Sequence, residues 1–170
     1  VDELNECRSP AQRRLIFDEF FLFQRGLAIR RAGEKHIKKE HSIRIDQKIR
    51  RSVLNVLPFR LTSGQKKALK EIVDDLRNPY PMNRLLQGDV GSGKTILAVL
   101  AGLVVMENGL QVALMSPTEL LAYQHYMNIS KLLSGSSFKA VLLTGSLSGK
   151  DRQNLLARLR KGECHLVVGT

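Results

Sequence analysis

The chain has 170 residues, of which 43% are hydrophobic and 25% are charged, and its formal net charge is +11. No apolar run reaches the roughly eighteen residues that a transmembrane helix needs, and no secretory signal precedes the chain's first helical pattern. We therefore expect no membrane segment. The excess of Lys and Arg predicts a polyanionic partner. Cys7 and Cys164 are far apart in the sequence and show no metal-binding spacing, so we expect both thiols to be reduced and the protein to be cytoplasmic.

The first predicted helix begins at Pro10 and ends near Arg31. Ser9 and Gln12 stand in the S-x-x-Q pattern of a capping box, with proline at the first helical position. Aromatic side chains cover more than one face of this helix, so we expect it to be wedged between two layers. The aromatic residues are Phe17, Phe20, Phe21 and Phe23. The charged segment 32–51 is predicted to be a connector that is helical in part.

From Leu57 onward, short apolar runs alternate with helical patterns, which predicts an α/β fold with a parallel sheet. The chain should therefore contain a helical linker at residues 1–56 and an α/β region at residues 57–170. The expected strands are residues 112–115, 140–143 and 166–168, and the expected helices are residues 63–77, 95–107, 118–133 and 149–161.

A phosphate-binding motif occupies residues 88–95, which read Gly-Asp-Val-Gly-Ser-Gly-Lys-Thr and fit G-x-x-x-x-G-K-[ST] at every fixed position. A short apolar run at residues 84–87 precedes it, and we expect that run to be a strand. A long apolar helix follows. Glycines allow backbone N–H groups to turn inward around phosphate oxygens. The loop therefore predicts a site for a nucleoside triphosphate, made by Gly88, Asp89, Val90, Gly91, Ser92, Gly93, Lys94 and Thr95.

Two residues of this motif are candidates for the chemistry of the bound phosphates. Lys94 would place a positive charge near the β and γ phosphates, and Thr95 would offer its hydroxyl to a Mg²⁺ ion that bridges them. We expect the Lys94 side chain to face solvent in the absence of nucleotide. The helix that begins here also directs its positive dipole end toward the anion.

Three further segments accompany the loop: residues 59–65 (Phe-Arg-Leu-Thr-Ser-Gly-Gln), residues 116–120 (Ser-Pro-Thr-Glu-Leu) and residues 144–146 (Thr-Gly-Ser). In this order with the loop, they resemble the first motor domain of superfamily 2 helicases. The longer words at residues 13–21, 57–62 and 81–95 are similar to those of the RecG family. This resemblance implies a RecA-like fold, ATP and Mg²⁺ as cofactors, monomeric action, and branched DNA such as forks and Holliday junctions as the partner.

The resemblance also assigns roles to two residues before the loop. It implies that Gln65 reads the adenine base through its carboxamide and that Phe59 packs near the ring. An alternative remains for Gln65, because Thr62 and Gln65 also form a T-x-x-Q capping box whose glutamine would bond backbone N–H groups.

The segments after the predicted strands are candidates for contact with the DNA backbone. Hydroxyls and helix N-terminal N–H groups can bind phosphates, and ligands of open α/β sheets lie at the carboxyl ends of the strands. Residues 116–119 have an alternative role as an S-x-x-E helix cap. The candidates are Ser116, Pro117, Thr118, Glu119, Thr144, Gly145, Ser146, Gly169 and Thr170.

One part of the machinery for ATP hydrolysis is missing from the strand ends. Helicases use an Asp-Glu pair after an apolar strand, and none of the three predicted strands is followed by one. We expect that pair and a second motor domain to lie beyond Thr170, so that the chain is part of a longer helicase and inactive alone. Alternatives are a transcription-repair coupling or primosomal translocase, a non-catalytic ATP-binding remnant, and a small-molecule kinase.

Overall fold

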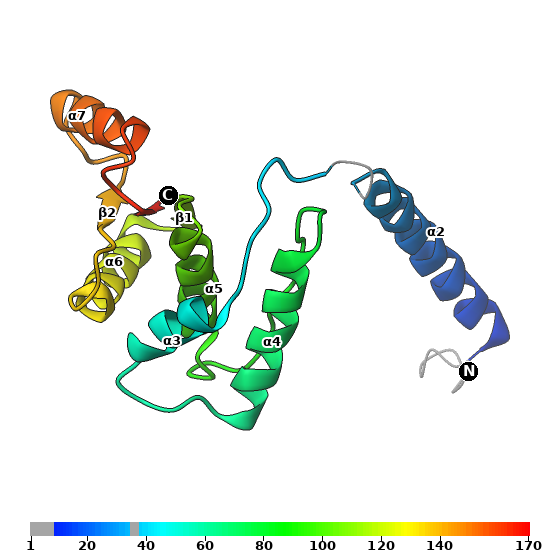
Figure 1. Ribbon diagram of the computed structural model, residues 1–170. Coiled ribbons are helices and arrows are strands. Elements are labelled where there is room, and N and C mark those ends of the chain that lie inside the picture. Colours follow the sequence, from blue (N-terminus) through cyan, green and yellow to red (C-terminus); the bar gives the residue numbers. More distant parts are fainter. Residues whose placement is uncertain (1–8, 35–37) are drawn as a thin grey trace. The chain divides into compact units, whose positions relative to one another are not determined.

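The protein is described by a computed structural model, in which residues 9–34 and 38–170 are defined (Figure 1). Cys7 lies outside these ranges, whereas Cys164 is completely buried. The chain divides into two units, one composed of Val1–His41 and Asn78–Met82 and the other of Ser42–Arg77 and Asn83–Thr170. Among the described residues, no helix combines the length and apolar character needed to cross a membrane.

The first unit contains the helix α2 (Pro10–Glu34). Its predicted capping box is confirmed, because the Gln12 backbone N–H donates to Ser9 Oγ over 3.3 Å and Ser9 Oγ donates to Gln12 Oε1 over 2.8 Å. The prediction that this helix is wedged between two layers is wrong for the described residues. Its four phenylalanines are each more than half exposed, so the apolar surface of α2 is left open.

The second unit begins with helices that precede the sheet. The connector predicted at residues 32–51 ends in α3 (Gln47–Asn55), which Asp46 caps by accepting from the Ile49 N–H. The next helix is α4 (Ser63–Arg77), and the apolar α5 (Lys94–Glu107) packs against both α3 and α4. Ile43, Ile49 and Val53 are buried in the core that these helices share. The boundary predicted at residue 57 stays a prediction.

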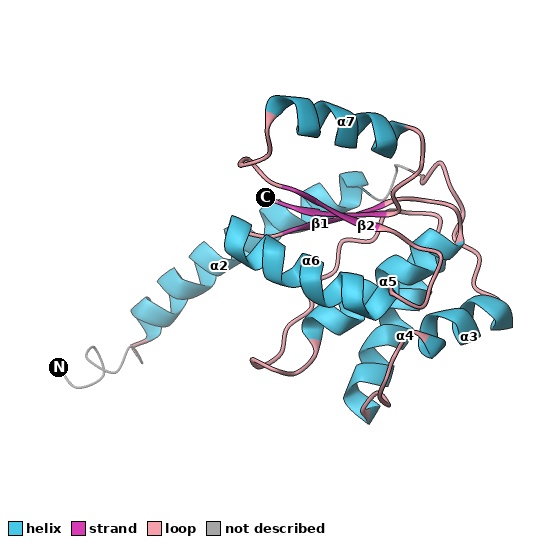
Figure 2. Ribbon diagram, turned by 90° about the vertical axis from the view of Figure 1, so that its left-hand side faces the viewer, coloured by secondary structure: helices cyan, strands magenta, loops and turns pink. Residues whose placement is uncertain are grey.

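The α/β prediction is confirmed by a parallel sheet in the order β1-β3-β2. Its strands are β1 (Val112–Met115), β2 (Ala140–Leu143) and β3 (Leu166–Gly169). The first two have the predicted bounds, and β3 is one residue longer than predicted. The helix α6 (Glu119–Leu133) packs against β2 and β3, and α7 (Gly149–Arg160) lies on the opposite side of the strands (Figure 2). The central strand β3 is therefore buried between two helical layers.

The strand predicted at residues 84–87 is wrong, since these residues have no regular secondary structure. A strand is stabilised by hydrogen bonds to a neighbouring strand, and the three-stranded sheet of the described residues does not include this segment. Leu85 is 85% exposed in consequence. The phosphate-binding motif is therefore held by contacts other than those of a sheet.

Candidate nucleotide and nucleic-acid sites

The motif at residues 88–95 forms a turn that leads into α5. The Ser92 N–H donates to the Asp89 carbonyl over 3.2 Å, and Gly93 is the N-cap residue of the helix. Gly91 and Gly93 have φ angles of 81° and 90°, in the left-handed region that favours glycine. A Cβ atom on Gly93 would also lie 2.5 Å from Gln65 Nε2. Residues with side chains would therefore both strain and fill this turn.

Gly88 does not have a positive φ angle, so the motif does not need glycine here for its backbone conformation. It needs the space that a missing side chain leaves. A Cβ atom on Gly88 would lie 2.8 Å from Ser92 Oγ. The remaining positions of the motif are open to solvent: Asp89, Val90 and Thr95 are exposed. Thr95 stands at the start of α5, where a hydroxyl can reach a metal ion bound to phosphates at the helix N-terminus.

The Lys94 side chain is bound within the loop. Its Nζ atom donates to the carbonyl oxygens of Gly88 and Asp89, each over 2.7 Å. The prediction that Lys94 faces solvent is therefore wrong, because two carbonyls of its own loop satisfy the ammonium group. Phosphate oxygens are stronger acceptors for an ammonium group than neutral carbonyls, so an incoming nucleotide can take the place of these two bonds.

Gln65 forms hydrogen bonds both at the start of α4 and with the phosphate-binding loop. Its Oε1 atom accepts from the Thr62 N–H over 3.0 Å, and Thr62 Oγ1 accepts from the Gln65 N–H over 3.2 Å, which confirms the capping box. Its Nε2 atom donates to the Ser92 carbonyl over 2.9 Å. A carboxamide has two N–H donors and two oxygen lone pairs. One donor and one lone pair therefore remain for a base, and contact with adenine stays a prediction.

Arg84 was not singled out by the sequence analysis, yet it anchors the segment before the motif. Its Nε atom lies 2.6 Å from Asp75 Oδ2, and its Nη1 atom lies 2.9 Å from Glu71 Oε2. The hydrogen bond to Asp75 is the main cause of a raised pKa for Arg84. Both carboxylates belong to α4, the helix that Gln65 caps. Their spacing of four residues, on one helical face, was the available sequence signal.

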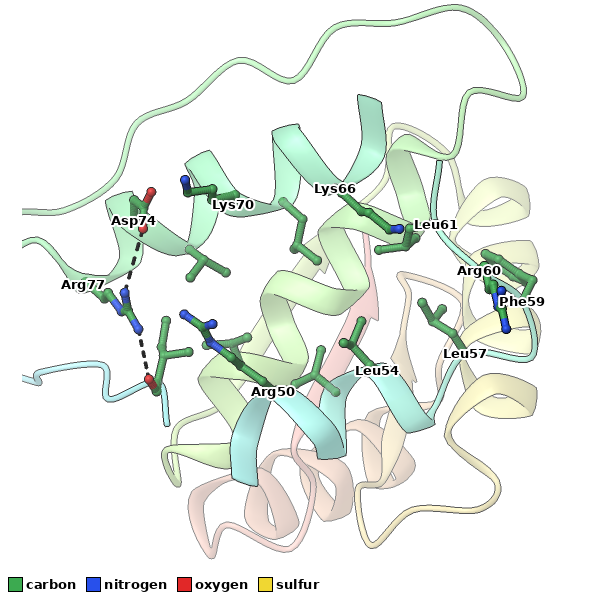
Figure 3. A pocket seen from close by; sticks show the side chains of 15 residues that line it. Arg50, Leu54, Leu57, Phe59, Arg60, Leu61, Lys66, Lys70, Asp74 and Arg77 are labelled. Carbon is green, nitrogen blue, oxygen red and sulfur yellow. Dashed lines mark hydrogen bonds and ion pairs between the residues drawn. The ribbon is translucent and has the colours of Figure 1, made fainter. Parts of the chain in front are cut away.

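Phe59 lies at the rim of a cavity of about 590 Å³ between α3 and α4 (Figure 3). Val53, Leu57 and Leu69 are among the apolar residues that line it, and cationic side chains stand around it. Arg77 Nη2 closes one end by donating to the Ile45 carbonyl over 3.0 Å. Phe59 is about half exposed, so its ring is accessible. Its contact with a base stays a prediction.

The three segments predicted to bind DNA meet at one edge of the sheet. Met115 and Leu143 are both in register with Gly169, so all three strands end together. Ser116, Thr144 and Thr170 follow these strand ends. The Ser116 N–H donates to the Gly169 carbonyl over 2.8 Å. The structure therefore brings together segments that are separated by up to 54 residues, since 170 minus 116 is 54.

The alternative role of residues 116–119 as an S-x-x-E cap is wrong. Thr118 is the N-cap of α6, and its Oγ1 atom accepts from the Leu121 N–H over 3.3 Å. The Ser116 hydroxyl is therefore not used for capping. It is buried, with the residue only 7% exposed, and its Oγ atom has no hydrogen-bond partner among the described residues. Leaving a buried hydroxyl unsatisfied costs free energy, and a hydrogen bond to this atom would remove that cost.

The other candidates at this edge have distinct surroundings. Glu119 Oε1 accepts from the Ser146 N–H over 3.1 Å, and Ser146 Oγ lies 2.9 Å from Thr144 Oγ1. Gly169 is buried, and a side chain there would collide with the Leu143 carbonyl, so glycine is needed for strand packing. The remaining candidates are exposed and accessible to a ligand: Pro117, Thr118, Gly145 and Thr170.

Comparisons with known proteins agree with this geometry. The family described as DEAD/DEAH box helicase matches residues 62–170. The chain is 45% identical over 172 aligned residues to the ATP-dependent DNA helicase RecG of Aquifex aeolicus, covering 100% of this chain and 21% of that protein. It is 42% identical over 168 residues to RecG of Bacillus subtilis, covering 99% of this chain and 25% of that protein.

A solved structure of RecG bound to a three-way DNA junction has the same fold. The TM-score is 0.83 at 38% sequence identity, with 93% of this chain and 22% of that chain covered. The chain thus spans about a fifth to a quarter of the length of the curated relatives that it matches. Similarity to RecG extends over both units of the chain.

Proposed function

Because the chain belongs to the DEAD/DEAH box helicase family, we propose that it is the nucleotide-binding part of an ATP-dependent DNA helicase that acts on branched DNA. The observation that carries this proposal is a complete phosphate-binding loop in a chain that is similar to RecG over its whole length. The transcription-repair coupling and primosomal alternatives are not favoured by these similarities. Residues 1–56 are proposed as the linker and residues 57–170 as part of the first motor domain.

The loop residues fit ATP and Mg²⁺. Gly91 and Gly93 open the turn, and Gly88 leaves space where a side chain would meet Ser92. Lys94 would exchange its two carbonyl partners for phosphate oxygens, and Thr95 would hold Mg²⁺. The ion would neutralise phosphate charge when bound. Gln65 would hold the loop from one side through Ser92 and use its remaining donor and lone pair to recognise adenine, beside Phe59.

The edge of the sheet is the proposed contact for the DNA backbone. The hydroxyl groups of Ser116, Thr144 and Ser146 would bind phosphates without reading base sequence. This choice fits an enzyme that recognises the shape of a junction and not its sequence. The net charge of +11 would assist by attracting the phosphates over a longer range. We also propose that the protein acts as a monomer in the cytoplasm.

Three measurements on the 170-residue chain test this function. Isothermal titration should show ATP binding that requires Mg²⁺, and fluorescence anisotropy should show binding to a labelled three-way junction that weakens as salt rises. Turnover of ATP should be negligible with or without the junction, since no described strand is followed by Asp-Glu. A folded chain that binds no ATP would contradict the nucleotide site, and junction-stimulated turnover would contradict the predicted lack of activity.

A further inference from the structure

The proposed DNA-binding edge contains one carboxylate, that of Glu119, whose charge would repel a phosphate. We propose that Glu119 is a positioning residue, which holds the turn at residues 144–146 in the conformation that receives the DNA backbone. It does so from α6, while the contacts with DNA are made by other groups. This inference rests on the proposed function, because it concerns the same edge of the sheet.

The fold places Glu119 where it can reach this turn. It is the first residue of α6, and α6 packs against β2 and β3. The turn at residues 144–146 directly follows β2, so it lies beside the start of that helix. Thr118 already caps α6 with its own hydroxyl. The Glu119 carboxylate is therefore not needed for capping and is available to another partner.

That partner is the backbone of the turn. Glu119 Oε1 accepts from the Ser146 N–H over 3.1 Å, which links residues 27 positions apart in the chain. The same oxygen would lie 3.1 Å from a Cβ atom added to Gly145. A side chain at position 145 would thus crowd the carboxylate, and glycine permits this close approach. The residue types at positions 119 and 145 suit each other.

Glu119 affects both ends of the turn, because the residue that it holds is itself hydrogen-bonded to the first residue of the turn. Ser146, which Glu119 holds by its N–H, has its Oγ atom 2.9 Å from Thr144 Oγ1. Hydrogen bonds to a charged acceptor are stronger than those between neutral groups. The carboxylate therefore restricts the two hydroxyls that would contact a phosphate. Without this restriction the two hydroxyls would still be present, but they would be more mobile. DNA binding would then cost more conformational entropy.

A second observation concerns the hydroxyl group of Ser116. Ser116 Oγ is buried and has no hydrogen-bond partner among the described residues. Ser116 and Thr144 follow strands that flank β3, so the two hydroxyl residues are about 10 Å apart, which is two strand spacings. A fixed spacing between the two segments is what Glu119 would maintain.

The test compares two substitutions of Glu119 with matched substitutions of Glu163. Glu119→Gln keeps an acceptor oxygen without the charge, whereas Glu119→Ala removes the acceptor. Glu163 is exposed, lies 3.4 Å from Arg158 Nε and precedes β3, at the opposite edge of the same sheet. Glu163→Gln and Glu163→Ala therefore remove a charge and weaken that ion pair without touching the turn. Affinity for a labelled three-way junction is measured by anisotropy, and exchange of the Ser146 amide hydrogen is measured by NMR without DNA.

We expect Glu119→Ala to lower the affinity for the junction by about fivefold, the effect of one lost hydrogen bond, and to speed exchange at Ser146. Glu119→Gln should leave both quantities within about twofold of the unaltered chain, because a neutral acceptor retains part of the bond. Both Glu163 variants should bind the junction at least as tightly as the unaltered chain. Thermal melting of each variant checks that the fold is retained.

Several results would overturn this role. Tighter binding by both Glu119 variants would show that the carboxylate acts by repulsion alone. Unchanged affinity of Glu119→Ala, with faster exchange at Ser146, would show that the turn needs no positioning. Unchanged exchange would show that the bond is not formed. If the unaltered chain binds no junction, the proposed DNA function itself fails, and the exchange at Ser146 still reports separately whether the bond exists.

Discussion

The nucleotide loop and the carboxyl edge of the sheet are both proposed phosphate sites, yet they differ in how their polar groups are satisfied. In the loop, Lys94 bonds two carbonyls and Gln65 bonds Thr62 and Ser92. At the edge, the buried hydroxyl of Ser116 has no partner among the described residues. The loop therefore satisfies its own polar groups before its ligand arrives, whereas the edge of the sheet keeps one buried hydroxyl without a partner.

This difference teaches how each site exchanges contacts on binding. A nucleotide must replace bonds that the loop already makes, so its net gain depends on the stronger attraction between charged groups. A DNA phosphate at the edge would satisfy a hydroxyl that is otherwise unpaired. Substitutions in the loop should consequently alter both nucleotide affinity and the conformation of the free chain. Those at Ser116 should alter affinity with little cost to the free chain.

The largest effect is expected at Lys94. Lys94→Ala should lower ATP affinity by at least about 100-fold, because two bonds between an ammonium and phosphates are lost at about 1.5 kcal/mol or more each. It should also loosen the free loop, since the bonds to Gly88 and Asp89 disappear. Isothermal titration with ATP and Mg²⁺ measures the first effect, and amide exchange at residues 88–93 measures the second.

Lys161→Ala is the matched control for Lys94, because Lys161 is an exposed lysine at the end of α7. Its ATP affinity should equal that of the unaltered chain. If Lys94→Ala bound ATP normally while its loop exchanged faster, Lys94 would be a purely structural residue. The hydrogen bonds of Lys94 within the loop would then stabilise the fold and have no part in nucleotide binding.

A smaller effect is expected at Gln65. Two substitutions of this residue distinguish its role in capping α4 from its proposed role in recognising the base. Gln65→Glu keeps the acceptor that caps α4 but loses the donor, and Gln65→Ala loses both. ATP affinity should fall by about tenfold in each variant, the loss of one to two hydrogen bonds, while GTP affinity changes less. Only Gln65→Ala should lose the stability of the cap, about 1 kcal/mol in thermal or urea unfolding.

Equal losses of ATP and GTP affinity would contradict the role of Gln65 in reading adenine. They would indicate that Gln65 acts on the nucleotide only through Ser92 and the loop. Titration with both nucleotides under one set of conditions therefore decides between the two interpretations of this residue. The capping bonds in the structure are compatible with either result.

The sequence predicted the elements of the sheet well because each has a strong local pattern. The strands at residues 112–115 and 140–143 are apolar runs bounded by loop residues, and the helices between them have clear caps. The strand predicted at residues 84–87 is wrong for a different reason. That run is apolar at Leu85 and Leu86, but a strand depends on a neighbouring strand, which composition cannot reveal.

The candidate sites divide in the same way. The residues of the phosphate loop lie together in sequence, so a spacing rule was sufficient to find them. The partner of Glu119 is 27 residues away, and the Thr118 cap competes with a cap by Ser116. Both choices depend on tertiary packing. Sequence patterns identified which residues belong to the edge of the sheet but not what each of them contacts.

The smallest effect is expected at Arg84, which tests whether the loop depends on α4 for its position. Arg84→Gln should lower ATP affinity by about threefold and reduce the melting temperature, because Glu71 and Asp75 would then face each other without a cation. Arg84→Lys should recover only part of the affinity, since an ammonium cannot span two carboxylates as a guanidinium does.

A double substitution makes this last test specific to the ion pairs. Combining Arg84→Gln with Asp75→Asn should destabilise the chain by less than the sum of the two single changes, because the pairs share one network. High salt should also reduce the difference between Arg84→Gln and the unaltered chain. The hydrogen bond to Asp75 raises the pKa of Arg84 above the ordinary value of a guanidinium, so the side chain stays charged at neutral and mildly alkaline pH, and such pH values should not mimic the substitution. Equal ATP affinities of Arg84→Gln, Arg84→Lys and the unaltered chain would show that the loop does not need the ion pairs of Arg84 for its position.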